Sequence, residues 1–293
     1  MIELPQNFSP KKVCQVTHKL SDHPAFKLSA LSALVERLPS SFIRFHTTKA
    51  QADTDFDKAC QLYPAKMTVK DAMANLAHSG SWIAVHYANI DPEYKDVLSE
   101  VMGEMKKSIN PLDPGVDFCV LWIFIQSPRS ITPFHMDHEN NFILQIKGTK
   151  TAHIWNPNTI IPKDKNEVFL GAGLRDQIKF KEDFLRESEK LTFEPGKGAY
   201  MPSASPHLVF NHDEISITCS FTYITKKTYE RAQVCRLNHM LRRRGFSPSF
   251  YEGRGLDSAK YRAIHSLLRL RKYLTKIDDR PYWMAGRPYG MTI

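Results

Sequence analysis

The sequence feature that most constrains the fold is a run of short, β-rich segments between residues 117 and 224. Val, Ile, Phe and Tyr dominate these segments, and Gly, Pro, Asn or charged residues separate them. Short strands with turn residues at this spacing predict an antiparallel sandwich or barrel. The segments are VLWIFIQS, NFILQIKG, TAHIWNP, GAYMP, HLVFN and ISITCSFTYI.

Residues 1–110 precede this run and contain both helical and strand patterns. Apolar residues recur at helical spacing in two places and follow strand patterns in two others. We expect this region to cover a sheet and not to carry chemistry. Its expected elements are a helix at 26–38, strands at 41–46 and 82–90, and a helix with Asp91 as its cap and Pro92 in its first turn.

The C-terminal region, residues 226–293, holds the positive charge of the chain. It contains 16 Lys and Arg against 5 Asp and Glu, whereas the whole chain of 293 residues has a net charge of +9. Two segments, 231–245 and 258–274, have helical patterns. The change in composition near Thr225 predicts three parts: a mixed helix and strand region at 1–110, a β core at 111–225 and a basic helical region at 226–293.

Two interpretations of the basic region are open. Arg242–Arg244 and the RLRK run at 269–272 favour binding to phosphate polymers, but no DNA-reading motif accompanies them. The favoured interpretation is a solvated helical face or a dimerisation element in which Leu267, Leu268 and Leu270 are partly buried. We therefore expect a homodimer formed through these helices, with nucleic-acid binding as the less favoured alternative.

Cysteine usage and hydropathy indicate a cytoplasmic protein. The five cysteines are odd in number, scattered and without a CxxC pair, so neither a disulfide framework nor a thiolate zinc site is expected. No apolar run reaches the roughly 20 residues that span a bilayer. The first residues lack the basic-then-apolar pattern of a signal peptide. We expect a reducing cytoplasm and no membrane partner.

Residues 159–191 form a long connection without a clear strand or helix pattern. A charged connection of this length within a compact domain is often a lid over a functional site. We expect it to form part of a substrate-binding wall.

The segment TPFHMDHENN, residues 132–141, concentrates side chains that bind metals. It fits a polar surface loop, a nucleophile–base pair or one half of a metal site. In an extended chain, His135 and Asp137 point to the same face and can bind one ion. The third ligand must come from another strand, and His207 is the candidate. Two histidines and one carboxylate leave three positions open, which suits non-haem Fe(II) better than structural zinc.

The HxD pattern alone is too short to be specific, but the residues around it resemble a known family. Both halves of the motif stand in the register of the Jumonji-C (JmjC), cupin-like 2-oxoglutarate oxygenases. The resemblance covers residues 117–224 and is closest to the asparaginyl hydroxylase of hypoxia-inducible factor. The matching positions are Thr132, His135, Asp137, Asn141, Phe142, 145–148 and Lys150, followed by Pro195, Gly196, Tyr200, Pro202, His207 and Asn211.

The resemblance implies a mainly β fold with flanking helices, the double-stranded β-helix or jelly roll. It also implies an Fe(II)- and 2-oxoglutarate-dependent dioxygenase. Such an enzyme converts 2-oxoglutarate to succinate and hydroxylates a substrate C–H bond, or demethylates the substrate when the carbon is bound to nitrogen. The substrate would be a protein or peptide side chain, or a small molecule. The resemblance assigns His135, Asp137 and His207 to iron, and Thr132, Asn141 and Lys150 to 2-oxoglutarate.

One position departs from the pattern of the family. The last core strand has Ser220 where the hydroxylase has asparagine, and we expect this shorter side chain to hydrogen-bond in the co-substrate site. His138 and Glu139 are expected to be bystanders or to face the substrate. The alternative to an oxygenase is a cupin-like regulatory module that binds metal without turnover. Such a module is expected to have lost a ligand or the lysine, and this sequence keeps both.

Overall fold

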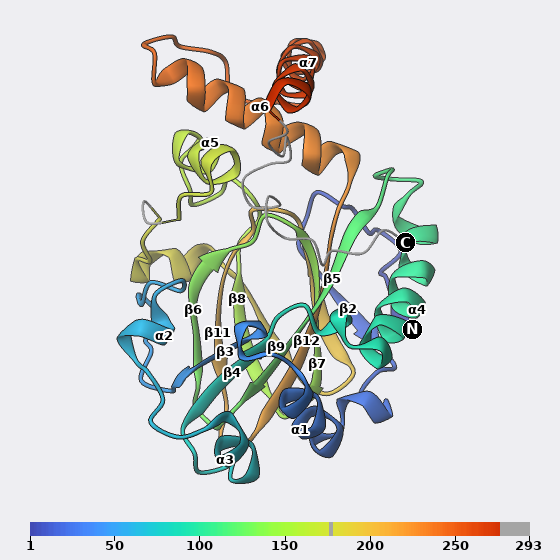
Figure 1. The fold of residues 1–293 in the computed structure, drawn as a ribbon, viewed down its shortest axis with the longest axis vertical. Coiled ribbons are helices and arrows are strands. Elements are labelled where there is room, and N and C mark those ends of the chain that lie inside the picture. Colours follow the sequence, from blue (N-terminus) through green and yellow to red (C-terminus); the bar gives the residue numbers. More distant parts are fainter. Residues whose placement is uncertain (176–177, 276–293) are drawn as a thin grey trace.

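The computed structural model describes residues 1–175 and 178–275. In these residues the strands form two antiparallel sheets, and the helices lie outside them (Figure 1). The strands are β1 Ile2–Glu3, β2 Cys14–His18, β3 Ile43–Thr47, β4 Ser81–Val85, β5 Asp117–Gln126, β6 Ile131–Met136, β7 Asn140–Lys147, β8 Lys150–Ile154, β9 Glu189–Phe193, β10 Lys197–Met201, β11 Pro206–Asn211 and β12 Ser216–Ile224. The α-helices are α1 Leu28–Arg37, α2 Ala59–Leu62, α3 Val69–Ala74, α4 Pro92–Ile109, α5 Lys163–Ala172, α6 Lys226–Arg242 and α7 Gly255–Thr275. Short 3₁₀ turns are η1 Pro24–Phe26, η2 Ser40–Phe42, η3 Ala88–Ile90 and η4 Glu182–Glu187.

The two sheets form the predicted double-stranded β-helix. The larger sheet has eight strands in the order β1-β2-β10-β7-β12-β5-β4-β3, and the smaller sheet has four in the order β6-β11-β8-β9. From β5 to β12 the chain passes repeatedly between the sheets, and the paired strands are antiparallel. The mainly β fold with flanking helices is therefore confirmed, and the two inner faces enclose a space that side chains from both sheets can reach.

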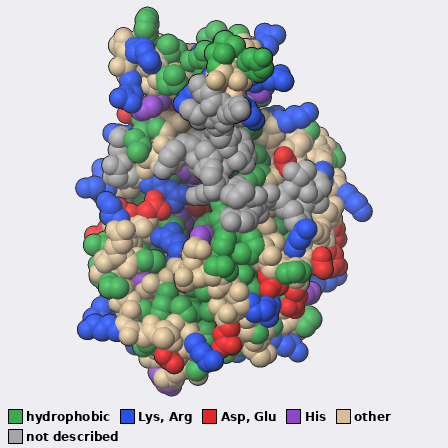
Figure 2. Space-filling model, viewed as in Figure 1, with side chains coloured by type: hydrophobic (Ala, Val, Ile, Leu, Met, Phe, Trp, Pro, Cys, Tyr) green, Lys and Arg blue, Asp and Glu red, His purple; other side chains and the backbone are tan. Residues whose placement is uncertain are grey.

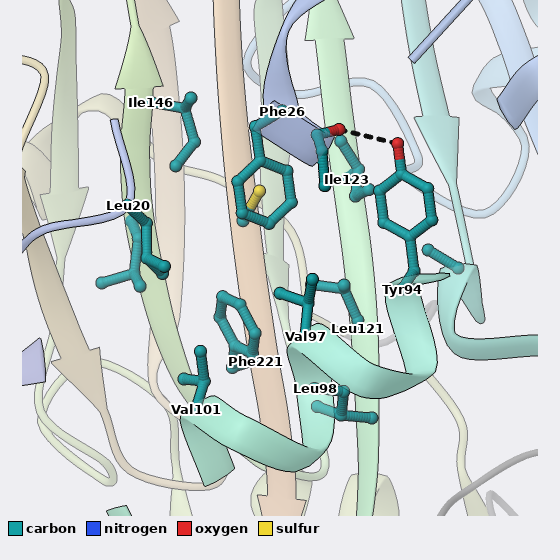
Figure 3. Packing of buried hydrophobic residues seen from close by; sticks show 14 of the residues in the cluster. Leu20, Phe26, Tyr94, Val97, Leu98, Val101, Leu121, Ile123, Ile146 and Phe221 are labelled. Carbon is teal, nitrogen blue, oxygen red and sulfur yellow. Dashed lines mark hydrogen bonds between the residues drawn. The ribbon is translucent and has the colours of Figure 1, made fainter. Parts of the chain in front are cut away.

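Helix α4 covers the outer face of the large sheet (Figure 3). Its buried residues recur every three or four positions, which is the spacing of one helix face. Each large apolar side chain that is fully buried contributes about 1.5–3 kcal/mol. Tyr94 also donates a hydrogen bond from its hydroxyl to the carbonyl oxygen of Ala25 at 2.7 Å, which ties the helix to η1. The packed side chains include Tyr94, Val97, Leu98 and Val101 from α4 and Leu121, Ile123 and Phe221 from the sheet.

The start of α4 has the predicted cap. The side chain of Asp91 accepts a hydrogen bond from the backbone N–H of Glu93 at 3.1 Å, and Pro92 occupies the first turn. Asp91 also pairs with Arg37 at 2.9 Å. This ion pair joins the end of α1 to the start of α4.

The strand predicted at 82–90 is too long. Strand β4 ends at Val85, and Tyr87 has a φ of 57°, which breaks the extended backbone. The next three residues form η3. The alternating pattern of the sequence continues past this turn, so it could not mark the end of the strand.

The described residues of the 159–191 connection, 159–175 and 178–191, hold more secondary structure than predicted, because they contain α5, η4 and the start of β9. Helix α5 packs against α6. Its sequence pattern is weak because polar residues are buried beside apolar ones: Asn166 and Glu167 are both covered, and each bonds another side chain. Just beyond the helix, Gly173 and Arg175 line the cavity between the sheets.

Residues 1–110 do more than cover the sheet, which corrects the expectation from sequence. Strands β1 and β2 extend the large sheet at one edge, and β3 and β4 extend it at the other. The added strands and the loop before α2 bring Arg44, Phe56 and Asp57 to the cavity between the sheets.

The described part of the basic region consists of α6 and α7, which pack on each other (Figure 1). On α7, Leu268 is buried, whereas Leu267 is 53% and Leu270 56% exposed, so only one of the three leucines expected to be partly buried is covered. No helix among the described residues is long and apolar enough to cross a membrane. Residues 276–293 lie outside the described residues, and the division of the chain into three parts stays a prediction.

Candidate active site

Three potential metal ligands lie together between the sheets. His135 lies near the end of β6, Asp137 follows that strand, and His207 lies in β11. Because His135 and His207 are direct cross-strand partners, their ring centroids are 4.0 Å apart. One ligand atom from each of the three residues lies within 4.8 Å of the others. The structure thus brings together the three residues that the sequence nominated as metal ligands.

Both histidines are held in the tautomer that suits a metal. Nδ1 of His135 lies 2.8 Å from the carbonyl oxygen of Pro133, and Nδ1 of His207 lies 3.1 Å from that of Ser205. A carbonyl oxygen only accepts, so each Nδ1 carries the hydrogen and each Nε2 keeps its lone pair. The two Nε2 atoms lie 3.9 and 3.8 Å from the carboxylate oxygens of Asp137.

The surroundings also keep His135 neutral. Burial is the main cause that lowers the pKa of His135 well below its usual value. Repulsion from a second proton on the neighbouring His207 and from the charges of Arg175 and Arg44 lowers this pKa further. A neutral imidazole is the form that binds a metal. Two imidazoles and one carboxylate fit a divalent iron ion, and metal binding by these residues stays a prediction.

Phe56 supports the ring of His135. The two rings stack with centroids 3.8 Å apart and planes at 4° to each other. The guanidinium of Arg44 lies 4.4 Å from the centre of the Phe56 ring and donates a hydrogen bond to the Phe56 carbonyl oxygen. Sequence reasoning missed both residues, because they lie far from the HxD motif and belong to no motif of their own.

A second group of polar side chains surrounds Lys150 at the start of β8. Its Nζ donates a hydrogen bond to Oε1 of Gln126 at 3.1 Å. Nε2 of Gln126 and Nε1 of Trp82 each donate to Oγ1 of Thr132 at 3.0 Å. Since its oxygen already accepts two hydrogen bonds, the Thr132 hydroxyl has its own hydrogen left to donate to a ligand. Trp82 and Gln126 are cross-strand partners in β4 and β5, and neither was predicted from sequence.

Lys150 is a buried cation and not a solvated turn residue. It is 2% exposed, and burial lowers the pKa of its ammonium group to about 7. No ion pair joins it to a carboxylate in residues 1–175 and 178–275. A buried ammonium without a counter-charge favours an anionic ligand. The turn before it requires Gly148, which has a φ of 74° and whose missing Cβ would lie 2.2 Å from the carbonyl oxygen of Ile215.

Asn141 and Ser220 form another wall of the cavity. They lie in the neighbouring strands β7 and β12, and Nδ2 of Asn141 donates to Oγ of Ser220 at 3.3 Å. Oδ1 of Asn141 is buried and makes no hydrogen bond within the described part of the chain. A half turn of the amide would let Asn141 accept from Ser220 and donate into the cavity. That orientation suits a carboxylate ligand.

All seven predicted site residues line one cavity of about 400 Å³. They are Thr132, His135, Asp137, Asn141, Lys150, His207 and Ser220. Their roles toward iron and 2-oxoglutarate stay predictions.

Residues 120–231 of the chain match a family model described as the JmjC domain. The chain carries a JmjC domain. This match confirms the predicted family of cupin-like 2-oxoglutarate oxygenases. The closer resemblance to the asparaginyl hydroxylase of hypoxia-inducible factor stays a prediction.

One solved structure shares the fold of this chain, and a second is similar to it. An X-ray structure of E. coli YcfD has a TM-score of 0.51 and 15% sequence identity, over 92% of this chain and 68% of that one. A crystal structure of the Escherichia coli ribosomal oxygenase YcfD has a TM-score of 0.48 and 14% identity, over 92% of this chain and 67% of that one. No curated protein matches the chain by sequence. At this level of identity the first likeness shows the fold alone.

Charged side chains of the JmjC protein border the cavity beside the ligand triad. Arg175 lies 4.0 Å from Asp137 and 3.4 Å from Asp57. His138 and Glu139, expected to be bystanders or to face the substrate, also line the cavity. Nε2 of His138 lies 3.1 Å from the carbonyl oxygen of Phe169, so this histidine ties the segment after β6 to α5.

Proposed function

We propose that this protein is an Fe(II)- and 2-oxoglutarate-dependent dioxygenase that hydroxylates a side chain of a protein or peptide. The observation that carries the proposal is that a buried Lys150, without a counter-charge among the described residues, shares one cavity with His135, Asp137 and His207. A simple metal site needs no buried lysine, and an anion site needs no triad. A ligand that chelates a metal at one end and carries a carboxylate at the other explains both.

The residues divide into two sets. His135, Asp137 and His207 would hold the iron, and Lys150 with Thr132 would hold the far carboxylate of 2-oxoglutarate. Asn141 and Ser220 would bind the same co-substrate from a second side. When bound, the iron supplies the activation of dioxygen that couples conversion of 2-oxoglutarate to succinate and CO2 with oxidation of a substrate C–H bond.

The remaining work falls to residues of this chain. Lys150 offsets the charge of the carboxylate, and Trp82 and Gln126 hold the Thr132 oxygen so that its hydrogen faces the ligand. Phe56 and Phe124 add apolar surface to the cavity, which helps to exclude water from the reacting groups.

Charged groups at the cavity support a macromolecular substrate. The side chain of Arg175 is 22% exposed and that of Asp57 is 55% exposed, so both can meet a partner outside the cavity while a substrate side chain enters it. Hydroxylation of a small molecule is the second candidate, and demethylation is the alternative outcome at a carbon bound to nitrogen. A metal-binding module without turnover is not favoured, because all three ligands and Lys150 are present in one cavity.

The test is turnover of the co-substrate. With Fe(II), ascorbate and O2, the purified protein should form succinate slowly from 2-oxoglutarate without added substrate. A peptide library or cell extract that contains the substrate should raise this rate and yield a product heavier by about 16 Da, one oxygen atom. An Asp137→Ala control should form no succinate. If iron and 2-oxoglutarate are both bound and the parent forms no succinate, the binding module becomes the better interpretation.

A homodimer formed through α7 is part of the proposal. Leu267, Leu270 and Leu274 are 53%, 56% and 69% exposed, and their spacing of three and four residues is that of a helix-pairing seam. Nucleic-acid binding has less support, since Arg242 of the basic run pairs with Glu167 at 2.7 Å. Where Figure 2 draws described residues, Lys and Arg are scattered over the face. The cytoplasmic location, expected from cysteine usage, also stays a prediction.

A further inference from the structure

A second cavity, of about 590 Å³, lies beside α5 and the first half of α6. Helix α5 lines it with Lys163, Asn166 and Leu170, whereas Gly173 and Arg175, just past the end of α5, line the active-site cavity. The second cavity contains none of the predicted metal or co-substrate residues. It is therefore a separate feature of the molecule.

Arg231 of α6 is the exceptional residue in this cavity. It is partly buried, and its guanidinium makes no hydrogen bond or ion pair with any described residue. Two other arginines, by contrast, are paired: Arg242 bonds Glu167 at 2.7 Å, and Arg37 bonds Asp91 at 2.9 Å. Burial lowers the pKa of the Arg231 guanidinium.

A guanidinium stays charged in proteins and has five N–H donors in a planar fork. Removing such a group from water without a partner destabilises a fold. The geometry of the fork matches the oxygens of a carboxylate or a phosphate. An unpaired arginine that lines a cavity therefore indicates an anionic ligand.

The neighbouring charges are consistent with such a ligand. Lys163 and Lys11 line the same cavity and make no ion pair in the described structure. Of the acidic residues that line it, Glu167 is held by Arg242 at 2.7 Å. Asp113 accepts a hydrogen bond from the Thr225 hydroxyl at 2.9 Å and lies 3.7 Å from Nζ of Lys227. Glu252 forms an ion pair with Arg254 at 4.0 Å. Glu230 also lines the cavity, without an ion pair to Arg231.

We propose that this second cavity binds a small oxyanion, a phosphate or carboxylate group, with Arg231 as its main contact and Lys163 as a second cation. The site is independent of the active-site cavity. Its ligand would supply the acceptors that the Arg231 fork lacks.

The test uses the full chain with its active site filled by Mn(II) and saturating 2-oxoglutarate. Sulfate serves as a tetrahedral dianion in place of phosphate, and malonate as a carboxylate; calorimetry measures the binding of each at millimolar concentrations. Binding of sulfate alone, malonate alone or both supports the proposal and tells the two ligand types apart. Arg231→Met should weaken binding by roughly tenfold or more, whereas Arg243→Met, which removes the same charge from the exposed end of α6, should not.

A melting experiment in buffer without oxyanions separates ligand binding from a structural role. Arg231→Met should keep or raise Tm, because it removes a desolvated charge that has no partner. A Lys163→Gln variant, whose exposed side chain is not needed for folding, should weaken anion binding by a smaller factor. The proposal is overturned if neither sulfate nor malonate binds the parent protein. It is also overturned if Arg231→Met binds these anions as tightly as the parent does, whether or not the Tm of the variant is lower.

Discussion

Nζ of Lys150 donates a hydrogen bond to Oε1 of Gln126 at 3.1 Å. The other end of the same amide donates to Thr132 at 3.0 Å, so one side chain positions both of the groups expected to bind the far carboxylate of 2-oxoglutarate. Rotation of this side-chain amide by half a turn would break both hydrogen bonds, so its orientation is fixed. Gln126 is therefore a positioning residue for the co-substrate site.

The first prediction concerns pH. Burial lowers the pKa of Lys150 to about 7 in the free protein, and a bound carboxylate would raise it again. Above pH 7 the lysine must therefore take up a proton when 2-oxoglutarate binds, so the affinity should fall as pH rises. Calorimetry with Mn(II), in buffers of different ionisation enthalpy, measures both the affinity and the proton uptake.

The stability of the free protein should have the opposite pH dependence. The unfolded lysine has its usual pKa of 10.5, so between pH 7 and 10.5 the unfolded state binds more protons than the folded one. The contribution of Lys150 to the free energy of unfolding should rise with pH through this window. A Lys150→Met variant should lack this contribution and bind 2-oxoglutarate roughly one to two orders of magnitude more weakly. Equal affinity in the variant and the parent would exclude the lysine from the site.

The second prediction concerns Gln126. Gln126→Met removes the contacts to Lys150 and Thr132 with little change in volume. We expect 2-oxoglutarate to bind roughly tenfold more weakly, with unchanged affinity for Mn(II), because the metal ligands do not contact this amide. Gln61→Met, at an exposed position of α2, is the matched control. Loss of metal affinity together with co-substrate affinity would show that Gln126 supports the whole barrel and not one end of the cavity.

The third prediction concerns the metal ligands. Alanine at His135, Asp137 or His207 should weaken anaerobic Fe(II) binding by orders of magnitude, since each would supply one of only three protein ligands. His212→Ala, at an exposed histidine just after β11, should bind iron as the parent does. Full iron affinity in His207→Ala would exclude it as the distal ligand.

The fourth prediction concerns Phe56, which stacks on His135 at 3.8 Å. An aromatic pair contributes about 0.5–1.5 kcal/mol beyond its buried area. Phe56→Leu keeps an apolar side chain but loses the stacked ring, so metal affinity should fall by roughly twofold to tenfold. Phe246→Leu, at a residue that is 62% exposed, is the control. If Phe56→Leu and Phe246→Leu bind Fe(II) with the same affinity, the stacked ring does not orient the imidazole of His135.

The fifth prediction concerns α7. Replacing Leu267 and Leu270 together by glutamate should convert a homodimer into a monomer in sedimentation experiments, because charges in a helix-pairing seam cannot be buried without partners. Leu62→Glu, at a position of α2 that is 55% exposed, should leave the mass unchanged. A different outcome would support nucleic-acid binding: the parent shifts a nucleic acid in a gel in a salt-dependent way, and the double variant loses this shift without a change in its sedimentation mass.

Sequence patterns predicted the parts of this fold in which local composition determines the structure. The strands of the large sheet within the barrel are buried on both faces and rich in apolar and β-branched residues, so β5, β7 and β12 were recognisable. Strand β9 was not, because its residues are mostly exposed and charged or polar. Helix α5 was missed because it buries Asn166 and Glu167 beside Phe169.

Only the site residues that belong to a sequence motif could be predicted. His135 and Asp137 share a face by strand periodicity, and the resemblance supplied Lys150, Thr132 and Asn141. Trp82 and Gln126 meet Thr132 through the pairing of β4 with β5, and pairing between distant strands leaves no local signal. Phe56 reaches His135 from a loop 79 residues earlier in the chain, so only the three-dimensional fold could reveal it.

The pairing of His135 with His207 across β6 and β11 limits how the gene for such a protein can change. Side chains alternate between the faces of a strand, so inserting or deleting one codon within either strand would turn a ligand outward. The connection between β8 and β9, residues 155–188, has no such restriction, because it does not set the pairing of β6 with β11. Insertions and deletions among descendants of this gene should therefore accumulate in that connection and be purged from the two ligand-bearing strands.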